Sequence, residues 1–355
     1  MSISTPTNPV LITGATGLVG SHIARQYLGA GWAVNVLHRP QNGYGLLTDL
    51  ADRITWHEGD IMDIPSLEMA VRVGQQGGLL DVIHAAAVVS FSPGESDRMH
   101  RVNVEGTANV VNVCLSAGVR KLGYVSSVAA LGRPAAKSGV KSGQPIVIGE
   151  GQKWEESPYN SAYAKSKYQA ELEVWRGLAE GLDAVMVCPS LVFGVGDWSR
   201  SSLQLVKYVQ DERPFYPAGT ANYVDVLDVA ESLYWLMKQD TREWTASARR
   251  YVLNAGTIPY RDLLTKIATA LGKRPPGLRM APGLTRFLWP LESVRAWLMG
   301  KTPLITRETA RSASSYYQYD GRKIEQVAGF QYRPLIRTLT RIAGAVNGQS
   351  GNSNF

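Results

Sequence analysis

The sequence predicts an α/β protein, with a doubly wound parallel sheet joined to a smaller, mostly helical lobe. The first observation is the opening, where apolar residues 10–12 precede Gly14, Gly17 and Gly20 and then a helical pattern. The second is the alternation of apolar runs and helical stretches that follows, which is typical of parallel sheets covered on both faces. The third is the loss of this rhythm after Pro189. We therefore expect a sheet-forming lobe of residues 1–190 plus 220–256, a second lobe of residues 191–219 plus 257–345, and a disordered tail of residues 346–355.

Each element is placed by its apolar pattern and by the glycines, prolines and polar residues around it. We expect strands at residues 10–12, 33–37, 54–56, 81–87, 121–127, 183–188 and 251–253. We expect helices at residues 18–28, 104–115, from about Ser161 onward, and at 224–237. Residues 132–152, rich in Gly, Ser, Lys and Pro, are expected to form a long surface loop.

Composition limits the class of protein. The chain has 355 residues, 45% of them hydrophobic and 19% charged, as in a globular protein with a large core. No apolar run is long enough to cross a bilayer, and residues 1–8 do not read as a signal peptide. Cys114 and Cys188 give neither a disulfide framework nor metal spacing, so we expect no metal and a reducing, cytoplasmic location.

The net charge of +7 is uneven along the chain. Residues 273–341 contain 13 Lys or Arg and 4 Asp or Glu. This excess could attract phosphates or an anionic membrane surface, but we favour a solvated basic face, and no nucleic-acid-binding motif accompanies it. Within this region, residues 284–298 form an apolar helical stripe interrupted by Pro290. The stripe is a core helix pair, a lid over a pocket, or a peripheral membrane contact.

The glycine turn is the first candidate binding site. A strand, a glycine turn and a helix N-terminus let backbone N–H groups approach a pyrophosphate. The spacing of Gly14, Gly17 and Gly20 is a variant of the dinucleotide-binding fingerprint. About twenty residues further on, where the cofactor ribose is sensed, His38-Arg39 stands in place of an acidic residue. A guanidinium there favours the 2′-phosphate of NADP, with NAD as the alternative, although Arg39 could simply be a surface residue at a strand end.

Two later strand ends extend this candidate site. Asp60, after the expected third strand, could accept a hydrogen bond from adenine, or could simply form a turn. The small residues Ala85, Ala86 and Ala87 would let the backbone come close to a cofactor. We interpret His84 as a packed or hydrogen-bonded core histidine rather than a catalytic one.

Tyr163 and Lys167 are the candidate catalytic pair. They are four residues apart, so on a helix both project from one face. A nearby ammonium stabilises a phenolate and lowers the pKa of the tyrosine, which makes it a usable proton donor or acceptor. The pair follows the glycine turn and the Ser126-Ser127 strand end in order. That ordered combination predicts an active site.

At this point residues 9–256 resemble the extended short-chain dehydrogenases/reductases, the NAD-dependent epimerase/dehydratase family. The resemblance rests on the segments at residues 13–20 (TGATGLVG), 59–61 (GDI), 84–86 (HAA), 103–107 (NVEGT), 125–127 (VSS), 163–167 (YAKSK) and 189–194 (PSLVFG). It implies a Rossmann fold whose second lobe binds the substrate, with monomers or homodimers as the expected assembly.

The resemblance also implies roles for individual residues. Ser127 would hydrogen-bond the substrate oxygen, Tyr163 would pass the proton, and Lys167 would bind the nicotinamide ribose and tune Tyr163. Asn103 would support the lysine, and the backbone of 189–192 would lie against the nicotinamide. The implied cofactor-binding set is Gly14, Thr16, Gly17, Leu18, Val19, Gly20, His38, Arg39, Asp60, Ile61, Ala85, Ala86, Ala87, Val125, Tyr163, Lys167, Pro189, Ser190 and Val192.

Within the family, the chain is most similar to the dihydroflavonol-reductase and 3β-hydroxysteroid-dehydrogenase-like group. Residues 128–130 supply no acidic side chain after the serine, which argues against a dehydratase. The resemblance therefore implies an NADP-dependent carbonyl reductase or secondary-alcohol dehydrogenase acting on a fairly apolar small molecule. One alternative is a nucleotide-sugar epimerase with tightly held NAD. The other is a dinucleotide-binding sensor without turnover, and the presence of Ser127, Tyr163 and Lys167 argues against this sensor.

Overall fold

The computed structural model describes residues 9–90, 94–134, 146–198, 201–280 and 316–348. The apolar stripe at 284–298 and most of the expected tail lie outside these ranges. None of the helices within them combines the length and the apolar character that crossing a bilayer requires.

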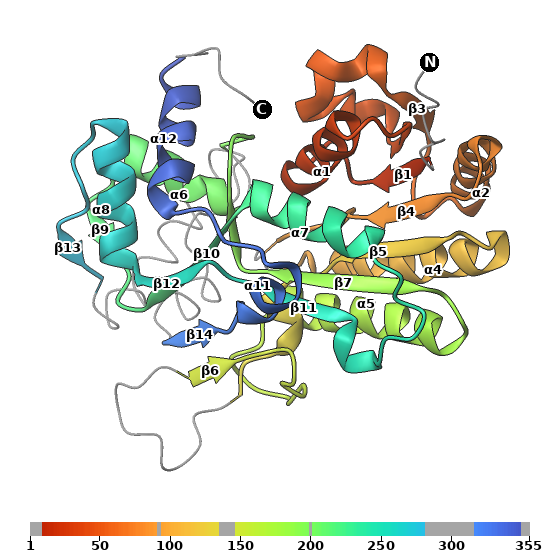
Figure 1. The fold of residues 1–355 in the computed structure, drawn as a ribbon. Coiled ribbons are helices and arrows are strands. Elements are labelled where there is room, and N and C mark those ends of the chain that lie inside the picture. The colour runs from red at the N-terminus through yellow and green to blue at the C-terminus, as the bar shows by residue number, and fades with distance from the viewer. Residues whose placement is uncertain (1–8, 91–93, 135–145, 199–200, 281–315, 349–355) are drawn as a thin grey trace.

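A seven-stranded, all-parallel sheet forms the larger lobe, with strand order β11-β7-β5-β4-β1-β2-β3 (Figure 1). Its strands are β1 (Val10–Thr13), β2 (Val34–His38), β3 (Thr55–Glu58), β4 (Asp81–His84), β5 (Lys121–Val125), β7 (Ala184–Pro189) and β11 (Arg250–Leu253). The predicted doubly wound α/β class is confirmed.

Helices cover both faces of this sheet. One face is covered by α1 (Leu18–Gly29) and α7 (Val226–Lys238), and the other by α2 (Ile64–Gly74), α4 (Gly106–Ala117) and α5 (Ala162–Ala179). Successive strand residues feed opposite layers, since Val10 and Ile12 join the α1–α7 core while Leu11 joins the other. Burial on both sides is why strands such as β1 and β7 are largely apolar, whereas the edge strand β3 is only partly buried and contains polar residues.

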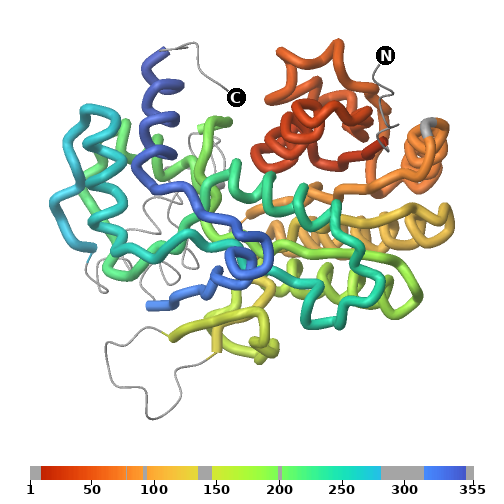
Figure 2. The backbone as a smooth tube through the Cα atoms, viewed as in Figure 1, coloured from red at the N-terminus to blue at the C-terminus, as the bar shows by residue number. Residues whose placement is uncertain are grey.

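The second lobe is a small sheet with helices packed against it. Its strands are β8 (Leu191–Phe193), β10 (Thr220–Asp225) and β12 (Gly256–Pro259), and its core also contains α6 (Gln204–Gln210), α8 (Tyr260–Leu271) and α12 (Leu335–Val346). Short pairs β9 (Phe215–Tyr216) with β13 (Leu278–Arg279), and β6 (Ile146–Ile148) with β14 (Tyr317–Tyr319), complete the sheets. In Figure 2 the blue C-terminal trace forms α11 (Arg322–Ala328) beside β11 before it reaches α12.

Several predicted boundaries need correction. The expected helix at 224–237 is wrong for Val224 and Asp225, which belong to β10, because Asp225 accepts a hydrogen bond from the backbone of Leu227 and caps α7. The expected strands at 81–87 and 121–127 end at His84 and Val125. The expected helix at 104–115 begins as one π-helical segment, His100–Glu105. The expected loop at 132–152 contains β6.

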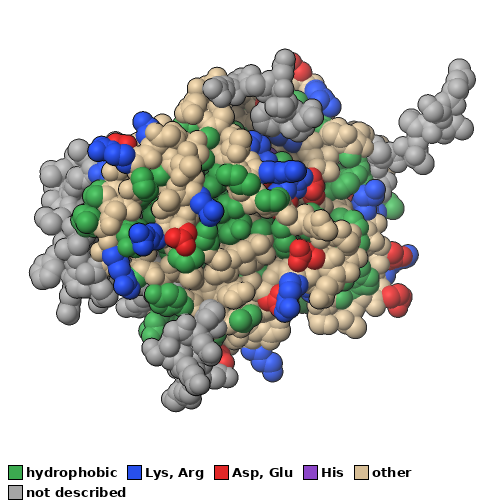
Figure 3. Space-filling view, turned by 60° about the vertical axis from the view of Figure 1, so that its left-hand side comes forward, with side chains coloured by type: hydrophobic (Ala, Val, Ile, Leu, Met, Phe, Trp, Pro, Cys, Tyr) green, Lys and Arg blue, Asp and Glu red, His purple; other side chains and the backbone are tan. Residues whose placement is uncertain are grey.

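Basic side chains of the C-terminal region are distributed among acidic ones. Arg274 pairs with Glu212 at 2.8 Å, and Arg322 pairs with Asp320 at 2.6 Å. On the face shown in Figure 3, Lys and Arg side chains lie at separate places, several beside an acidic group, rather than in one field. Along the described residues this agrees with the favoured interpretation of a solvated basic face.

Candidate active site

The glycine turn between β1 and α1 fits a pyrophosphate. Gly14 has φ +74°, and a Cβ there would lie 2.5 Å from the backbone N of Ala86. A Cβ on Gly20 would lie 2.3 Å from the Gly14 oxygen. These two glycines are required by the fold itself. A Cβ on Gly17, in contrast, would meet only the Gly14 oxygen at 3.5 Å, so the space before the uncapped N-terminus of α1 is open.

Neighbouring segments close around this turn. Thr16 packs under Gly45, where a Cβ would lie 2.5 Å from the Thr16 oxygen. Leu18 points toward the second lobe, because a Cβ on Gly196 would lie 2.8 Å from its Cδ1. The turn therefore lies where both lobes meet, next to the carboxyl ends of β1 and β4.

The end of β2 holds the predicted ribose-sensing residues. Arg39 follows the strand with its side chain 42% exposed, and its Nε lies 3.9 Å from Asp60 Oδ2. The His38 ring is buried against Trp56, with ring centroids 5.0 Å apart, and its Nδ1 lies 3.2 Å from the Gly43 oxygen. Of the predicted pair, Arg39 is thus the side chain available to a phosphate, while His38 packs inward.

The end of β4 confirms the interpretation of His84. It is fully buried between Thr13 and Thr107, and burial lowers its pKa to about 3. Ala85 and Ala86 are only half-buried and Ala87 is exposed, as a surface offered to a ligand requires. Ile61, in contrast, is buried against Gly106, since a Cβ added to Gly106 would lie 2.6 Å from the Cδ1 of Ile61.

Ser127 and Tyr163 are brought together from a strand end and a helix start. Ser127 follows β5 and its Oγ accepts a hydrogen bond from Ala129 N at 3.2 Å. Ser161 caps α5, with its Oγ 3.0 Å from Ala164 N, and so sets Tyr163 in the first turn. A hydrogen bond with Ser127 lowers the pKa of Tyr163, but burial outweighs it and the pKa is raised overall.

Lys167 lies one turn further along the same helix and is buried. Its Nζ donates to the Tyr124 hydroxyl at 2.8 Å and to the Val125 oxygen at 3.0 Å. Burial lowers the pKa of Lys167 to about 8. The expected lowering of the Tyr163 pKa by this ammonium is not seen, because burial is the larger effect and raises the pKa.

Asn103 joins the loop after β4 to α5. Its amide donates to the Val88 oxygen at 2.9 Å and to Ser166 Oγ at 3.0 Å, and its Oδ1 accepts from Val88 N at 2.7 Å. Ser166 is the residue before Lys167, so Asn103 contacts the helix that carries the lysine. Its support of the lysine stays a prediction.

The end of β7 offers an unpaired hydroxyl. Pro189 ends the strand, and Ser190 N donates to the Leu253 oxygen at 3.0 Å. Ser190 Oγ is buried and has no hydrogen-bond partner among the described residues. Val192 is half-buried nearby on β8. A buried hydroxyl without a partner costs free energy, so this position fits a polar ligand group such as a carboxamide.

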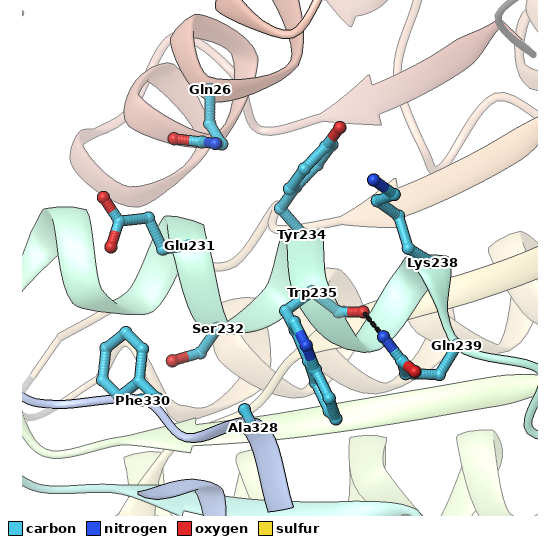
Figure 4. Close-up of a pocket in the computed structure, with 9 residues that line it drawn as sticks. All are labelled: Gln26, Glu231, Ser232, Tyr234, Trp235, Lys238, Gln239, Ala328 and Phe330. Carbon is cyan, nitrogen blue, oxygen red and sulfur yellow. Dashed lines mark hydrogen bonds between the residues drawn. The ribbon is translucent and has the colours of Figure 1, made fainter.

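Cavities elsewhere do not coincide with these residues. One of about 370 Å³ lies along α7, lined by its aromatic residues Tyr234 and Trp235 together with Phe330 (Figure 4). Gln239 at its edge accepts a hydrogen bond from Lys121, which begins β5, whereas Ser127 lies beyond the other end of that strand. This cavity is therefore remote from Ser127. Phe193 is fully buried in the core of the second lobe.

Comparison with known proteins decides the family. The model of the NAD dependent epimerase/dehydratase family matches residues 10–251. The chain belongs to this family. The glycine turn, the Ser127–Tyr163 contact and the buried lysine all lie within the matched range.

Curated relatives place this family member in the extended short-chain dehydrogenase/reductase group. A protein of Synechocystis sp. named "Putative dihydroflavonol 4-reductase" is 29% identical over 92% of this chain and 91% of its own. Sterol demethylase protein B of Methylococcus capsulatus is 26% identical over 94% of this chain and 95% of its own. The solved structure of gox2253 is 28% identical, covers 97% of this chain and 99% of its own, and superposes with a TM-score of 0.75. The chain is accordingly an NAD(P)-dependent oxidoreductase of the extended type.

Sequence analysis missed two residues of the site. Tyr124 holds Lys167 from β5. Glu171, buried one turn after Lys167, accepts a hydrogen bond from Ser126 at 2.7 Å and pairs with Arg250 at 2.7 Å. The spacing of Lys167 and Glu171 on one helix face was the available signal for Glu171. For Tyr124, the alternation of side chains along β5 predicts which face of the sheet it lies on. No local pattern predicts that it contacts Lys167.

Proposed function

We propose that this family member is an NADP-dependent carbonyl reductase or secondary-alcohol dehydrogenase that uses Ser127, Tyr163 and Lys167. The observation that carries the proposal is the hydrogen bond between Tyr163 and Ser127 at the carboxyl end of β5, with Lys167 one helical turn away. Ligands of doubly wound sheets bind at this edge. The open glycine turn and the unpaired Ser190 hydroxyl support a dinucleotide lying across the same edge.

The protonation state of Tyr163 suits the role of proton donor. Because burial raises its pKa, the phenol is protonated near neutral pH and is ready to donate. Bound NADPH supplies the hydride. Ser127 orients the carbonyl oxygen, Tyr163 delivers a proton to that oxygen, and Lys167 binds the nicotinamide ribose hydroxyls. A protonated Tyr163 is the state that the reduction of a carbonyl requires.

NADP is favoured over NAD by Arg39. Its guanidinium stands at the end of β2 with much of its side chain exposed, and a guanidinium matches a phosphate in charge and shape. The neighbouring Asp60 offers its Oδ1 to the backbone of Met62 at 2.9 Å, which leaves Oδ2 facing Arg39.

The substrate class is supported by the relatives. Their names refer to a dihydroflavonol and to a sterol, which are both ring compounds with a large carbon skeleton. We propose a ketone or aldehyde of this fairly apolar kind as the substrate.

The test is a screen of carbonyl compounds and nucleotide sugars in which NADPH absorbance is followed. The proposal expects NADPH consumption with at least one apolar ketone or aldehyde, and an alcohol as product. Release of stoichiometric NAD from heat-denatured protein, with interconversion of a nucleotide sugar and no net NADPH use, would instead establish the epimerase alternative.

A further inference from the structure

A buried chain of hydrogen bonds runs from Lys167 to the start of the glycine turn. Lys167 Nζ lies 2.8 Å from the Tyr124 hydroxyl, which is hydrogen-bonded in turn to Thr107. Thr107 Oγ1 lies 3.0 Å from His84 Nε2, and His84 Nδ1 lies 2.7 Å from Thr13 Oγ1. The five residues come from α5, β5, α4, β4 and β1, and all are buried.

The chemistry of the groups assigns every proton in this chain. Thr107 donates its hydroxyl hydrogen to the Asn103 oxygen at 2.5 Å, so its own oxygen can only accept, from Tyr124 and His84. An ammonium can only donate, so the Tyr124 oxygen accepts from Lys167 and its hydrogen points to Thr107. His84 is neutral because of its burial, carries its hydrogen on Nε2, and accepts at Nδ1.

We propose that Tyr124 is a positioning residue for Lys167. The hydrogen bonds behind Tyr124 orient its hydroxyl group so that its oxygen accepts a hydrogen bond from Lys167. This inference rests on the proposed role of Lys167 at the nicotinamide ribose. A lysine stem has many rotamers, and its ammonium has three hydrogens. Tyr124 and the Val125 oxygen take two of them, which leaves one for a ribose hydroxyl.

The hydrogen-bond chain also links the two ends of the proposed dinucleotide site. Thr13 is the last residue of β1 and directly precedes Gly14 of the pyrophosphate turn. At the other end, Lys167 lies one turn from Tyr163. A substitution in the middle of this hydrogen-bond chain, such as at Thr107, should therefore alter cofactor binding without contacting the cofactor.

Several titratable groups surround the ammonium and set its pKa together. Burial lowers the pKa of Lys167, while the carboxylate of Glu171 and the Cys188 sulfur raise it. The neutral ring of His84 stacks on Tyr124, with centroids 5.6 Å apart. The titratable groups that interact with Lys167 are Glu171 from its own helix, Tyr124 from β5, Cys188 from β7 and His84 from β4, and Tyr163 interacts with Tyr124.

The experiment uses Tyr124→Phe, which removes one oxygen and keeps the ring. NADPH is the probe, and its dissociation constant is measured by tryptophan fluorescence between pH 7 and 9.5. In wild type we expect affinity to fall as pH rises through about 8, where Lys167 loses its charge. Loss of a hydrogen bond to a charged group should move this midpoint down by about one pH unit in Tyr124→Phe.

Matched variants separate the possible outcomes. Lys167→Met should abolish the pH step, which identifies it with the lysine. Tyr27→Phe should keep the wild-type midpoint, because it removes an equally buried phenol oxygen with no partner among the described residues. Thr107→Val, which takes away the acceptor behind Tyr124, should shift the midpoint in the same direction and serves if Tyr124→Phe does not fold.

An unchanged midpoint in folded Tyr124→Phe, or in Thr107→Val if that variant serves, would overturn the positioning role while leaving the proposed function intact. If wild type shows no step and Lys167→Met binds NADPH normally, the proposed role of Lys167 itself fails. The two failures are therefore distinguishable.

Discussion

Replacing Arg39 by alanine should erase the preference for NADPH over NADH. The Arg39 and Asp60 side chains are 42% and 37% exposed, so their surroundings have a high, water-like dielectric. Two unit charges about 4 Å apart in water attract by about 1 kcal/mol. A phosphate near neutral pH carries nearly two negative charges, so Arg39 should contribute about 2 kcal/mol. This corresponds to a preference of about 30-fold.

The assay is fluorescence titration of wild type, Arg39→Ala and the control Arg53→Ala with each nucleotide. Arg53 is exposed at the end of the segment Gly45–Arg53, and no role in binding is assigned to it. We expect the ratio of dissociation constants to fall to near one in Arg39→Ala only, and to shrink with added salt in wild type. Equal affinities in wild type, or a preference that survives in Arg39→Ala, would refute the argument for NADP.

Two further predictions separate binding from folding. Gly17→Ala should abolish NADPH binding, because the added Cβ would occupy the proposed pyrophosphate space. It should change the unfolding midpoint little, because this Cβ would meet only one protein atom, at 3.5 Å. The control is Gly29→Ala, whose Cβ would meet nothing within 4 Å. Binding retained by Gly17→Ala would be evidence against the turn as the phosphate site. Arg341→Ala should destabilise the protein by about 3–5 kcal/mol in urea unfolding, because it leaves the fully buried Asp225 carboxylate without its cation. Exposed Arg337→Ala on the same helix should cost little, and equal losses would contradict this account.

The central sheet could be predicted from sequence because most of its strands contain a short local run of apolar residues. The register between strands, and the second lobe, could not. β10 pairs with β8 and β12 from distant parts of the chain, and no local pattern names those partners. The start of α7 could have been predicted from sequence, since an Asp such as Asp225 before an apolar helical stretch is a typical N-cap.

The candidate site shows the same division. Ser127, Tyr163 and Lys167 could be proposed from sequence because Ser127 follows a local apolar strand and Tyr163 and Lys167 are four residues apart on one helix. Tyr124 was not, because its contact with Lys167 spans 43 residues and depends on how α5 packs on β5. The direction of the Tyr163 pKa was also missed, because burial is a property of the folded chain.

The central claim is that the Tyr163 phenol donates the proton in an NADPH-dependent reduction. The most direct measurement compares NADPH turnover by wild type, Tyr163→Phe and Tyr159→Phe on the best carbonyl substrate, since Tyr159 is an exposed tyrosine just before the same helix. Loss of a general acid should slow Tyr163→Phe by about 10²–10⁴-fold while NADPH still binds and Tyr159→Phe turns over normally. Wild-type turnover by Tyr163→Phe would contradict the account.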